Sequence, residues 1–321
     1  MNIIKDGIIG LAIGDAMGVP LEFLSREKLQ QNITIDMKGY GTHNVKEGTW
    51  SDDTSMTLAF MDSYIEHGKI DYEDIMIKFN MWYRRGMYTT DGNVFDIGNT
   101  CYNAINKYYE YDINPIECGS DDIYSNGNGS LMRILPLAYI IYYNNISDEK
   151  EIYTLVKNIS SLTHRNDISV LGCYIYIMYV LSLLNGKDKI ESYRYIRNLK
   201  YDFFEKQTIN MYERILESDI SKLNMEDILS SGYIVHSLEA SLWSILTTNS
   251  YDDAIIKSIN LGEDTDTIGA ITGSIAGILY GYETFPNKWI TKMQQINNLE
   301  EYCNKFEKKL IKDGVKNDYK C

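Results

Sequence analysis

The segment Gly7-Ile8-Ile9-Gly10-Leu11-Ala12-Ile13-Gly14-Asp15-Ala16-Met17-Gly18 decides the fold, because its glycines recur at helical spacing. A second series, Gly269, Gly273, Gly277 and Gly281, repeats that spacing near the other end of the chain. Residues three and four apart share one face of a helix, so each series forms a smooth stripe. Each glycine costs a helix about 1 kcal/mol relative to alanine. We therefore expect the stripes to allow close helix approach in a buried centre.

Small residues at this spacing also occur where two membrane-spanning helices pack together. The uncharged stretch between Asp266 and Glu283 is shorter than the ~20 residues that a membrane span requires. The stripes are therefore interpreted as the centre of a globular core, and no membrane association is expected.

Apolar residues repeat at intervals of three and four along most of the chain. Ile75, Phe79 and Trp82 precede Gly86, and an apolar run over residues 168–184 precedes Gly186, so each predicted helix has a glycine stop signal. The four prolines and the lack of strand alternation favour the all-α class. We predict a single domain over residues 1–300 and a charged C-terminal tail over residues 301–321.

Composition limits the possible partners and the compartment. The chain has 321 residues, is 44% hydrophobic and carries a formal net charge of -14, so a large core is possible and nucleic-acid binding is not expected. Its five cysteines are widely spaced and form no CxxC pair, which is typical of a reducing cytoplasm. The N-terminus carries an acid early and lacks the form of a signal peptide. A cytoplasmic monomer is the expectation.

Two acidic clusters carry the candidate chemistry: Trp50-Ser51-Asp52-Asp53-Thr54 and Gly262-Glu263-Asp264-Thr265-Asp266-Thr267. Adjacent carboxylates diverge by about 100° inside a helix, but at a helix start they can converge on one ion. Oxygen ligands without histidine or cysteine select magnesium, manganese or calcium over zinc. Either cluster alone is also an ordinary helix N-terminus, with Ser51 or Asp52 as the cap. Two clusters beside small-residue helices favour the metal interpretation.

Four motifs occur in the order that characterises a known family: Gly14-Asp15-Ala16-Met17-Gly18-Val19-Pro20-Leu21-Glu22-Phe23, Ser51-Asp52-Asp53-Thr54, Asn128-Gly129-Ser130-Leu131-Met132-Arg133 and Asp264-Thr265-Asp266-Thr267. On these motifs the chain resembles the ADP-ribosylglycohydrolases. Matches at Phe95-Asp96-Ile97-Gly98, Thr163-His164 and Leu238-Glu239-Ala240 extend the resemblance across most of the sequence. It implies a compact orthogonal helical bundle with a dinuclear metal centre at the bottom of a cleft that takes ADP-ribose.

The resemblance also assigns roles to individual residues. It implies two divalent ions, Mg²⁺ or Mn²⁺, held by Ser51, Asp52, Asp53, Asp264, Asp266 and Thr267. Glu22 matches a glutamate beside the metals that takes part in catalysis or gates substrate entry, and Asp96 is the second candidate for the general base. Asp15 is expected to hold the structure by capping neighbouring amides or bonding groups behind the ligands.

Substrate contacts are expected from the turn that contains Asn128, Gly129, Ser130 and Met132, and from His164. Backbone amides of the turn can receive a pyrophosphate at the start of the helix that follows. An ordinary turn is the alternative, and His164 is equally interpreted as a buried hydrogen-bonding residue. The family often has glycine where this chain has Glu263, which can tighten metal binding, point to solvent or favour a cationic leaving group.

The predicted activity is metal-dependent hydrolysis of ADP-ribosylarginine in a protein or small molecule, with ADP-ribose as product. Hydrolysis of ADP-ribosylserine, O-acetyl-ADP-ribose or another conjugate is the second hypothesis. A catalytically inactive ADP-ribose reader is the third, and it predicts missing metal acids. A His-Asp phosphohydrolase needs paired histidine ligands, which the four scattered histidines do not supply.

Overall fold

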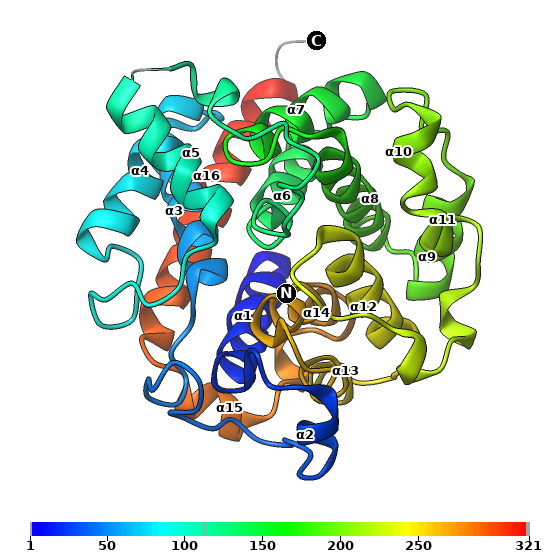
Figure 1. Ribbon diagram of the computed structural model, residues 1–321. Coiled ribbons are helices and arrows are strands. Elements are labelled where there is room, and N and C mark those ends of the chain that lie inside the picture. The colour runs from blue at the N-terminus through cyan, green and yellow to red at the C-terminus, as the bar shows by residue number, and fades with distance from the viewer. Residues whose placement is uncertain (1, 112, 319–321) are drawn as a thin grey trace.

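Helices supply the regular secondary structure of the residues described by the computed structural model, 2–111 and 113–318 (Figure 1). The α-helices are α1 (Ile3–Gly18), α2 (Arg26–Gln30), α3 (Asp52–His67), α4 (Tyr72–Arg85), α5 (Asn99–Tyr111), α6 (Leu135–Tyr143), α7 (Glu149–Ser161), α8 (Asp167–Leu184), α9 (Lys189–Asn198), α10 (Lys206–Asn210), α11 (Glu213–Leu216), α12 (Ile234–Leu246), α13 (Tyr251–Ile259), α14 (Thr265–Tyr280), α15 (Asn287–Lys292) and α16 (Ile296–Asp318). The predicted all-α class is confirmed.

The two glycine-striped helices, α1 and α14, form a buried antiparallel pair at the centre. A Cβ atom built on Gly14 would lie 2.0 Å from the carbonyl oxygen of Gly269, so the helix backbones touch without intervening side chains. At the end of the same contact, the Thr265 hydroxyl donates to the carbonyl oxygen of Gly18 (2.8 Å). The predicted close approach is therefore confirmed, and it brings the C-terminal end of α1 to the N-terminal end of α14.

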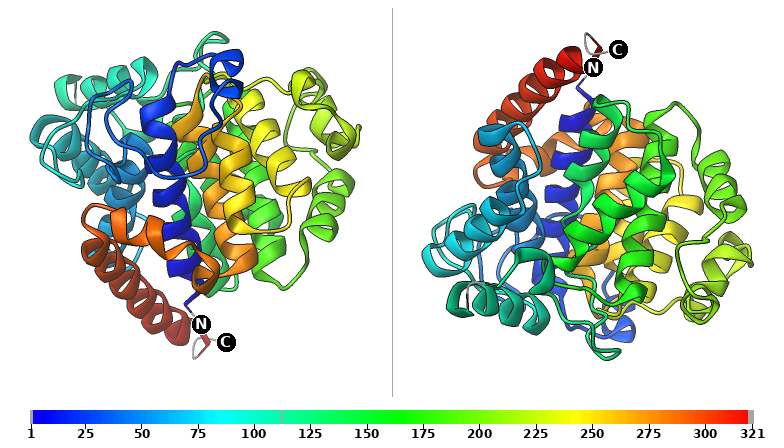
Figure 2. Two further views of the ribbon diagram at one scale, coloured as in Figure 1. Left: turned by 90° about the horizontal axis from the view of Figure 1, so that it is seen from below. Right: turned by 90° about the horizontal axis from the view of Figure 1, so that it is seen from above.

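The remaining helices surround this pair in two groups. Helices α3, α4, α5 and α16 lie on one side of α1, whereas α8 to α13 lie on the other (Figure 1). Both views in Figure 2 show α1 passing lengthwise through the molecule, with α14 alongside. The loops that follow α1 and precede α3 and α14 therefore meet at one end of the central pair.

Helix α8 is the apolar core helix that the sequence predicted over residues 168–184. By length and composition it is the one described helix that could cross a membrane, but 89% of it is buried inside the protein. A helix that is apolar on all sides is expected in the core of a large domain. Burial within the core explains its composition without a membrane.

The C-terminal segment differs from the predicted charged tail. Helix α16 begins at Ile296 and continues across residue 301 to Asp318. Cys303, Phe306 and Leu310 are fully buried, and α16 packs against α3. The abundant charges lie on the exposed face of an amphipathic helix, so residues 301–310 are part of the packed bundle.

Candidate metal centre and active site

The two acidic clusters meet at the end of the central helix pair. Helix α3 begins after its cap Ser51, and α14 begins after its cap Asp264, so both clusters stand at helix N-termini as predicted. The Thr267 hydroxyl donates to a carboxylate oxygen of Asp53 on the neighbouring helix (3.3 Å). Segments more than 200 residues apart in the chain therefore form one acidic site.

Asp15 fixes the N-terminus of α3 beneath this site. Its carboxylate accepts hydrogen bonds from the Ser51 amide (2.9 Å), the Thr54 amide (3.1 Å) and the Thr54 hydroxyl (2.6 Å). Burial raises the pKa of Asp15 to about 6, against the opposing effect of these donors. Asp15 thus has the structural role expected from the sequence.

The acids at the meeting point are buried without enough hydrogen-bond donors. Asp53 Oδ1 and Asp266 Oδ2 are buried and have no hydrogen-bond partner. Burial, followed by repulsion from neighbouring carboxylates, raises the pKa of Asp52, Asp53 and Asp266 well above the usual range. Ionised carboxylates in this setting are strongly destabilising unless a cation compensates them. Their oxygen atoms are the ligands that a hard divalent ion prefers, so the residues present suit a magnesium or manganese site.

Asn128 orients one of these acids. Its side-chain amide donates to Asp264 Oδ2 (2.6 Å) and to the Ser237 hydroxyl (2.8 Å). Carboxylate oxygens of Asp264, Asp266 and Glu22 come within 4.8 Å of one another. Asn128 therefore links the predicted substrate turn to the predicted metal ligands.

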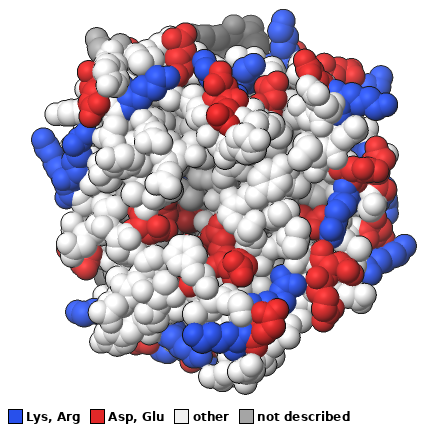
Figure 3. All heavy atoms as spheres, viewed as in Figure 1, with Lys and Arg blue, Asp and Glu red and all other residues white. Residues whose placement is uncertain are grey.

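A cleft of about 350 Å³ opens above the acids. Its lining includes nine of the predicted site residues, namely Glu22, Asp52, Asp96, Asn128, Gly129, Met132, His164, Asp264 and Thr267. The face seen in Figure 1 is hollowed at its centre, and acidic side chains lie at the edge of the hollow (Figure 3). Ser51, Asp53 and Asp266 lie below the lining and are nearly inaccessible.

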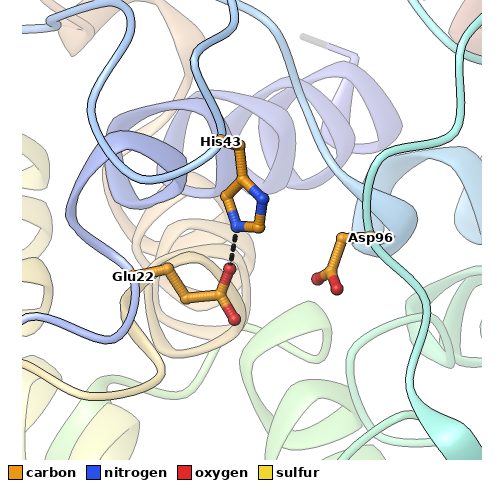
Figure 4. A group of neighbouring side chains, drawn as sticks. All are labelled: Glu22, His43 and Asp96. Carbon is orange, nitrogen blue, oxygen red and sulfur yellow. Dashed lines mark hydrogen bonds and ion pairs between the residues drawn. The ribbon is translucent and has the colours of Figure 1, made fainter.

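Glu22 is hydrogen-bonded to His43, a residue for which the sequence motifs predicted no role. His43 Nε2 is hydrogen-bonded to Glu22 Oε2, and Asp96 approaches from a separate loop (Figure 4). Burial raises the pKa of Glu22 to about 7, and the bond from His43 opposes this rise. Burial also raises the pKa of Asp96. The signal that could have revealed His43 is its place eight residues before Ser51, in the loop between two matched motifs.

His164 is held as a neutral imidazole at the cleft wall. The guanidinium of Arg133 donates to the Thr163 hydroxyl (2.7 Å), and the same hydroxyl is hydrogen-bonded to His164 Nδ1 (2.8 Å). Burial, assisted by Arg133, lowers the pKa of His164 to about 3. His164 is thus both a buried hydrogen-bonding residue and part of the cleft lining.

Ser130 and the turn around it differ from the expected phosphate cradle. The Ser130 side chain is fully buried, where it contacts Cys173 and accepts a hydrogen bond from Ser160 (3.0 Å). The amides of Leu131 and Met132 donate to the Asn128 carbonyl, and α6 begins only at Leu135. The side chain of Ser130 thus supports the turn from behind, and the turn does not open directly into a helix N-terminus.

Glu263 points to solvent. It is exposed, is not part of the cleft lining, and has a left-handed backbone with φ of 62°. Its carbonyl accepts from the Phe23 amide (2.7 Å), and its amide donates to the Leu24 carbonyl (2.9 Å). Glu263 thereby ties the loop after Glu22 to the loop before Asp264 through its backbone.

Buried carboxylates that converge at the end of a helical core form a site suited to a divalent metal ion. The ADP-ribosylglycohydrolase family model matches residues 2–316. The chain therefore belongs to the ADP-ribosylglycohydrolase family, whose members are metal-dependent hydrolases of glycosidic bonds in ADP-ribose conjugates.

Individual relatives agree with this assignment. An ADP-ribosylarginine hydrolase of Serratia proteamaculans is 33% identical over 303 residues, which cover 92% of this chain and 77% of the relative. The ADP-ribosyl-[dinitrogen reductase] glycohydrolase of Rhodospirillum rubrum is 28% identical, with 89% and 88% covered. A solved ADP-ribosylglycohydrolase-related protein complex shares the fold, with a TM-score of 0.79 at 24% identity over 96% of this chain and 98% of that chain.

Proposed function

We propose that the protein hydrolyses ADP-ribosylarginine and so reverses mono-ADP-ribosylation of a protein or small molecule. The observation that carries the proposal is the meeting of both acidic clusters below one cleft, with two buried carboxylate oxygens left without donors. The similarity to two ADP-ribosylarginine hydrolases, at 33% and 35% identity, supports arginine as the modified residue. Every acid that the family's metal site requires is present, which argues against an inactive reader.

Two divalent ions, Mg²⁺ or Mn²⁺, are proposed as cofactors. The residues that would hold them are Ser51, Asp52, Asp53, Asp264, Asp266 and Thr267, which meet at the N-termini of α3 and α14. When bound, such ions supply Lewis-acid stabilisation and bind the hydroxyls of the ribose. Asp15 and Asn128 then act as positioning residues, because each is bonded to a residue of this set.

Glu22 is the proposed general base. It lines the cleft beside Asp264 and Asp266, where its carboxylate can take a proton from a water molecule that attacks the anomeric carbon. The water oxygen bonds to the anomeric carbon and the carbon–nitrogen glycosidic bond breaks. Its electron pair passes to the guanidino nitrogen, which takes up the proton that Glu22 accepted, to give arginine and ADP-ribose. Asp96 lies in the same cleft and remains the second candidate. His164 offers an uncharged ring nitrogen to a polar group of ADP-ribose.

A reducing compartment is proposed for the protein. The described cysteines, at positions 101, 118, 173 and 303, are all buried and unpaired, which supports the cytoplasmic location expected from the sequence. The monomeric state is likewise a proposal.

The test is release of free ADP-ribose from an ADP-ribosylarginine protein and, in parallel, from an ADP-ribosylserine peptide. We expect release from the arginine conjugate at a kcat/KM at least about 100-fold above that for the serine conjugate, about 2.7 kcal/mol in transition-state stabilisation. Preferential release from the serine peptide would show that ADP-ribosylserine, the second hypothesis, is the substrate. No release from either, with ADP-ribose still bound, would favour a reader.

A further inference from the structure

The contact between Glu22 and His43 joins two side chains that are almost withdrawn from water. The side chains are 6% and 12% exposed, and Nε2 of His43 is bonded to one oxygen of the Glu22 carboxylate (Figure 4). A carboxylate accepts hydrogen bonds, so Nε2 is the donor and fixes the orientation of the acid. The second oxygen of Glu22 remains available to the cleft.

The loop that carries His43 is hydrogen-bonded to the backbone of Pro20 and Glu22. The Thr42 hydroxyl donates to the Glu22 carbonyl oxygen (2.6 Å), and the Thr42 amide donates to the Pro20 carbonyl oxygen (3.3 Å). Gly41 has a φ of 60°, and a Cβ atom there would lie 2.1 Å from the same Pro20 oxygen. Only glycine permits this close approach, so the loop is docked directly on the backbone of Pro20 and, through Thr42, on that of Glu22.

Two aromatic rings lie beside the imidazole. The ring centroid of His43 lies 5.0 Å from that of Phe95 and 6.0 Å from that of Phe23. These phenylalanines flank the two candidate bases, since Phe23 follows Glu22 and Phe95 precedes Asp96. The imidazole is therefore held between the two cleft walls that carry Glu22 and Asp96.

We infer that His43 is a positioning residue for the reaction, which holds the Glu22 carboxylate in its working orientation through Nε2–H. The inference rests on the proposed function, because it takes Glu22 as the base. Residues that orient a reacting group in this way typically contribute about 10- to 100-fold to activity. They contribute little to ground-state binding, because the group that they orient acts mainly in the transition state.

The experiment compares His43→Ala and His43→Gln with the full-length wild-type enzyme on an ADP-ribosylarginine protein. His43→Ala is expected to lower kcat by about 10- to 100-fold, with KM, the ADP-ribose dissociation constant and the metal activation constant changed by less than about 3-fold. His43→Gln retains a side-chain N–H donor and is expected to recover most of the lost rate. His67→Ala is the matched control, because His67 is half-exposed and pairs with Glu66 and Asp74 at the far end of α3.

A second arm uses the double variant His43→Ala/Glu22→Gln. It is expected to be no slower than Glu22→Gln alone, because His43 acts through Glu22. The inference is overturned if His43→Ala matches wild type, if Gln and Ala are equally slow, or if ADP-ribose or metal affinity falls as much as kcat. Failure of the proposed function looks different, because the wild-type enzyme itself then releases no ADP-ribose.

Discussion

Gly14 and Gly269 face one another so closely that a Cβ atom on Gly14 would lie 2.0 Å from the carbonyl oxygen of Gly269. The same pairing recurs one turn away, where a Cβ atom on Gly10 would lie 2.3 Å from the carbonyl oxygen of Gly273. This contact sets the separation of α1 and α14, and through it the positions of the acids at their ends. The glycine stripes thus help to position the buried acids as well as to form the core.

Gly14→Ala is expected to separate the central helices. The added methyl group meets backbone, which cannot rotate away, so we expect a loss of about 3 kcal/mol or more in the free energy of unfolding. Thermal denaturation followed by circular dichroism measures this loss. Gly98→Ala is the control, because nothing lies within 4 Å of a Cβ atom there. Equal melting temperatures for Gly14→Ala and wild type would refute the close contact.

Asp52→Ala and Asp266→Ala are each expected to abolish hydrolysis while leaving most of the helicity. Each removes a proposed metal ligand from a buried acidic site whose charge repulsion opposes folding without metal. Asp253→Ala removes an exposed acid from the first turn of α13, outside the cleft, and is expected to keep full activity. Turnover and far-ultraviolet circular dichroism are measured together. Activity retained by either ligand variant would contradict the proposed site.

The metal-free protein is expected to lose stability as pH rises. Burial raises the pKa of Asp15 to about 6 and that of Glu22 to about 7, above ordinary values of 3.8 and 4.5. An acid whose pKa is raised in the folded state stabilises that state at pH values below its ordinary pKa. This contribution to the free energy of unfolding disappears as the pH rises through the raised pKa. We therefore expect the melting temperature in chelator to fall between about pH 4 and about pH 7.

Added magnesium is expected to oppose the fall in melting temperature that rising pH produces in the metal-free protein. Bound cations favour ionised carboxylates, so added Mg²⁺ is expected to raise the melting temperature most at the upper end of the range. The double variant Asp52→Ala/Asp266→Ala lacks two of the buried acids. Its melting temperature in chelator is expected to fall less over this pH range than that of the wild type. A melting temperature in chelator that rises across this range in the wild type would contradict the account of the site.

Glu263→Gly is expected to leave activity unchanged and to maintain or raise stability. Glu263 has a φ of 62°, a left-handed conformation that costs a non-glycine residue about 1 kcal/mol and glycine almost nothing. Its side chain is exposed, and its contacts to Phe23 and Leu24 use only the backbone. Kinetics and thermal denaturation of this variant test the point. Weaker metal activation would instead assign the Glu263 carboxylate to the metal centre.

Much of the fold follows from regular patterns in the sequence. Helical spacing and small size predicted close helix approach in a buried centre, which the structure shows as the contact of α1 with α14. The acids beside these helices predicted where the site would form. Ser51 caps α3 with its hydroxyl accepting from the Asp53 amide (3.4 Å), as a serine before an acidic first turn predicts. These features depend on local chemistry and periodicity, which a single sequence displays.

Other features depend on tertiary contacts that no periodicity encodes. His43 acquires a role only because Thr42 and Gly41 dock on Pro20 and Glu22. Ser130 lies in a matched motif, yet contacts from α7 and α8 draw its hydroxyl into the core. In α16, the apolar residues that pack against α3 are outnumbered by charged residues on the exposed face. The charged composition therefore predicted a tail where the structure has a packed helix.

The most direct test of the central claim is the rate of ADP-ribose release from an ADP-ribosylarginine protein before chelation, after chelation, and after return of Mg²⁺ or Mn²⁺. The account predicts release that stops with chelator and recovers when the ion is restored. Undiminished release in chelator, from protein shown to contain no divalent metal, would contradict it.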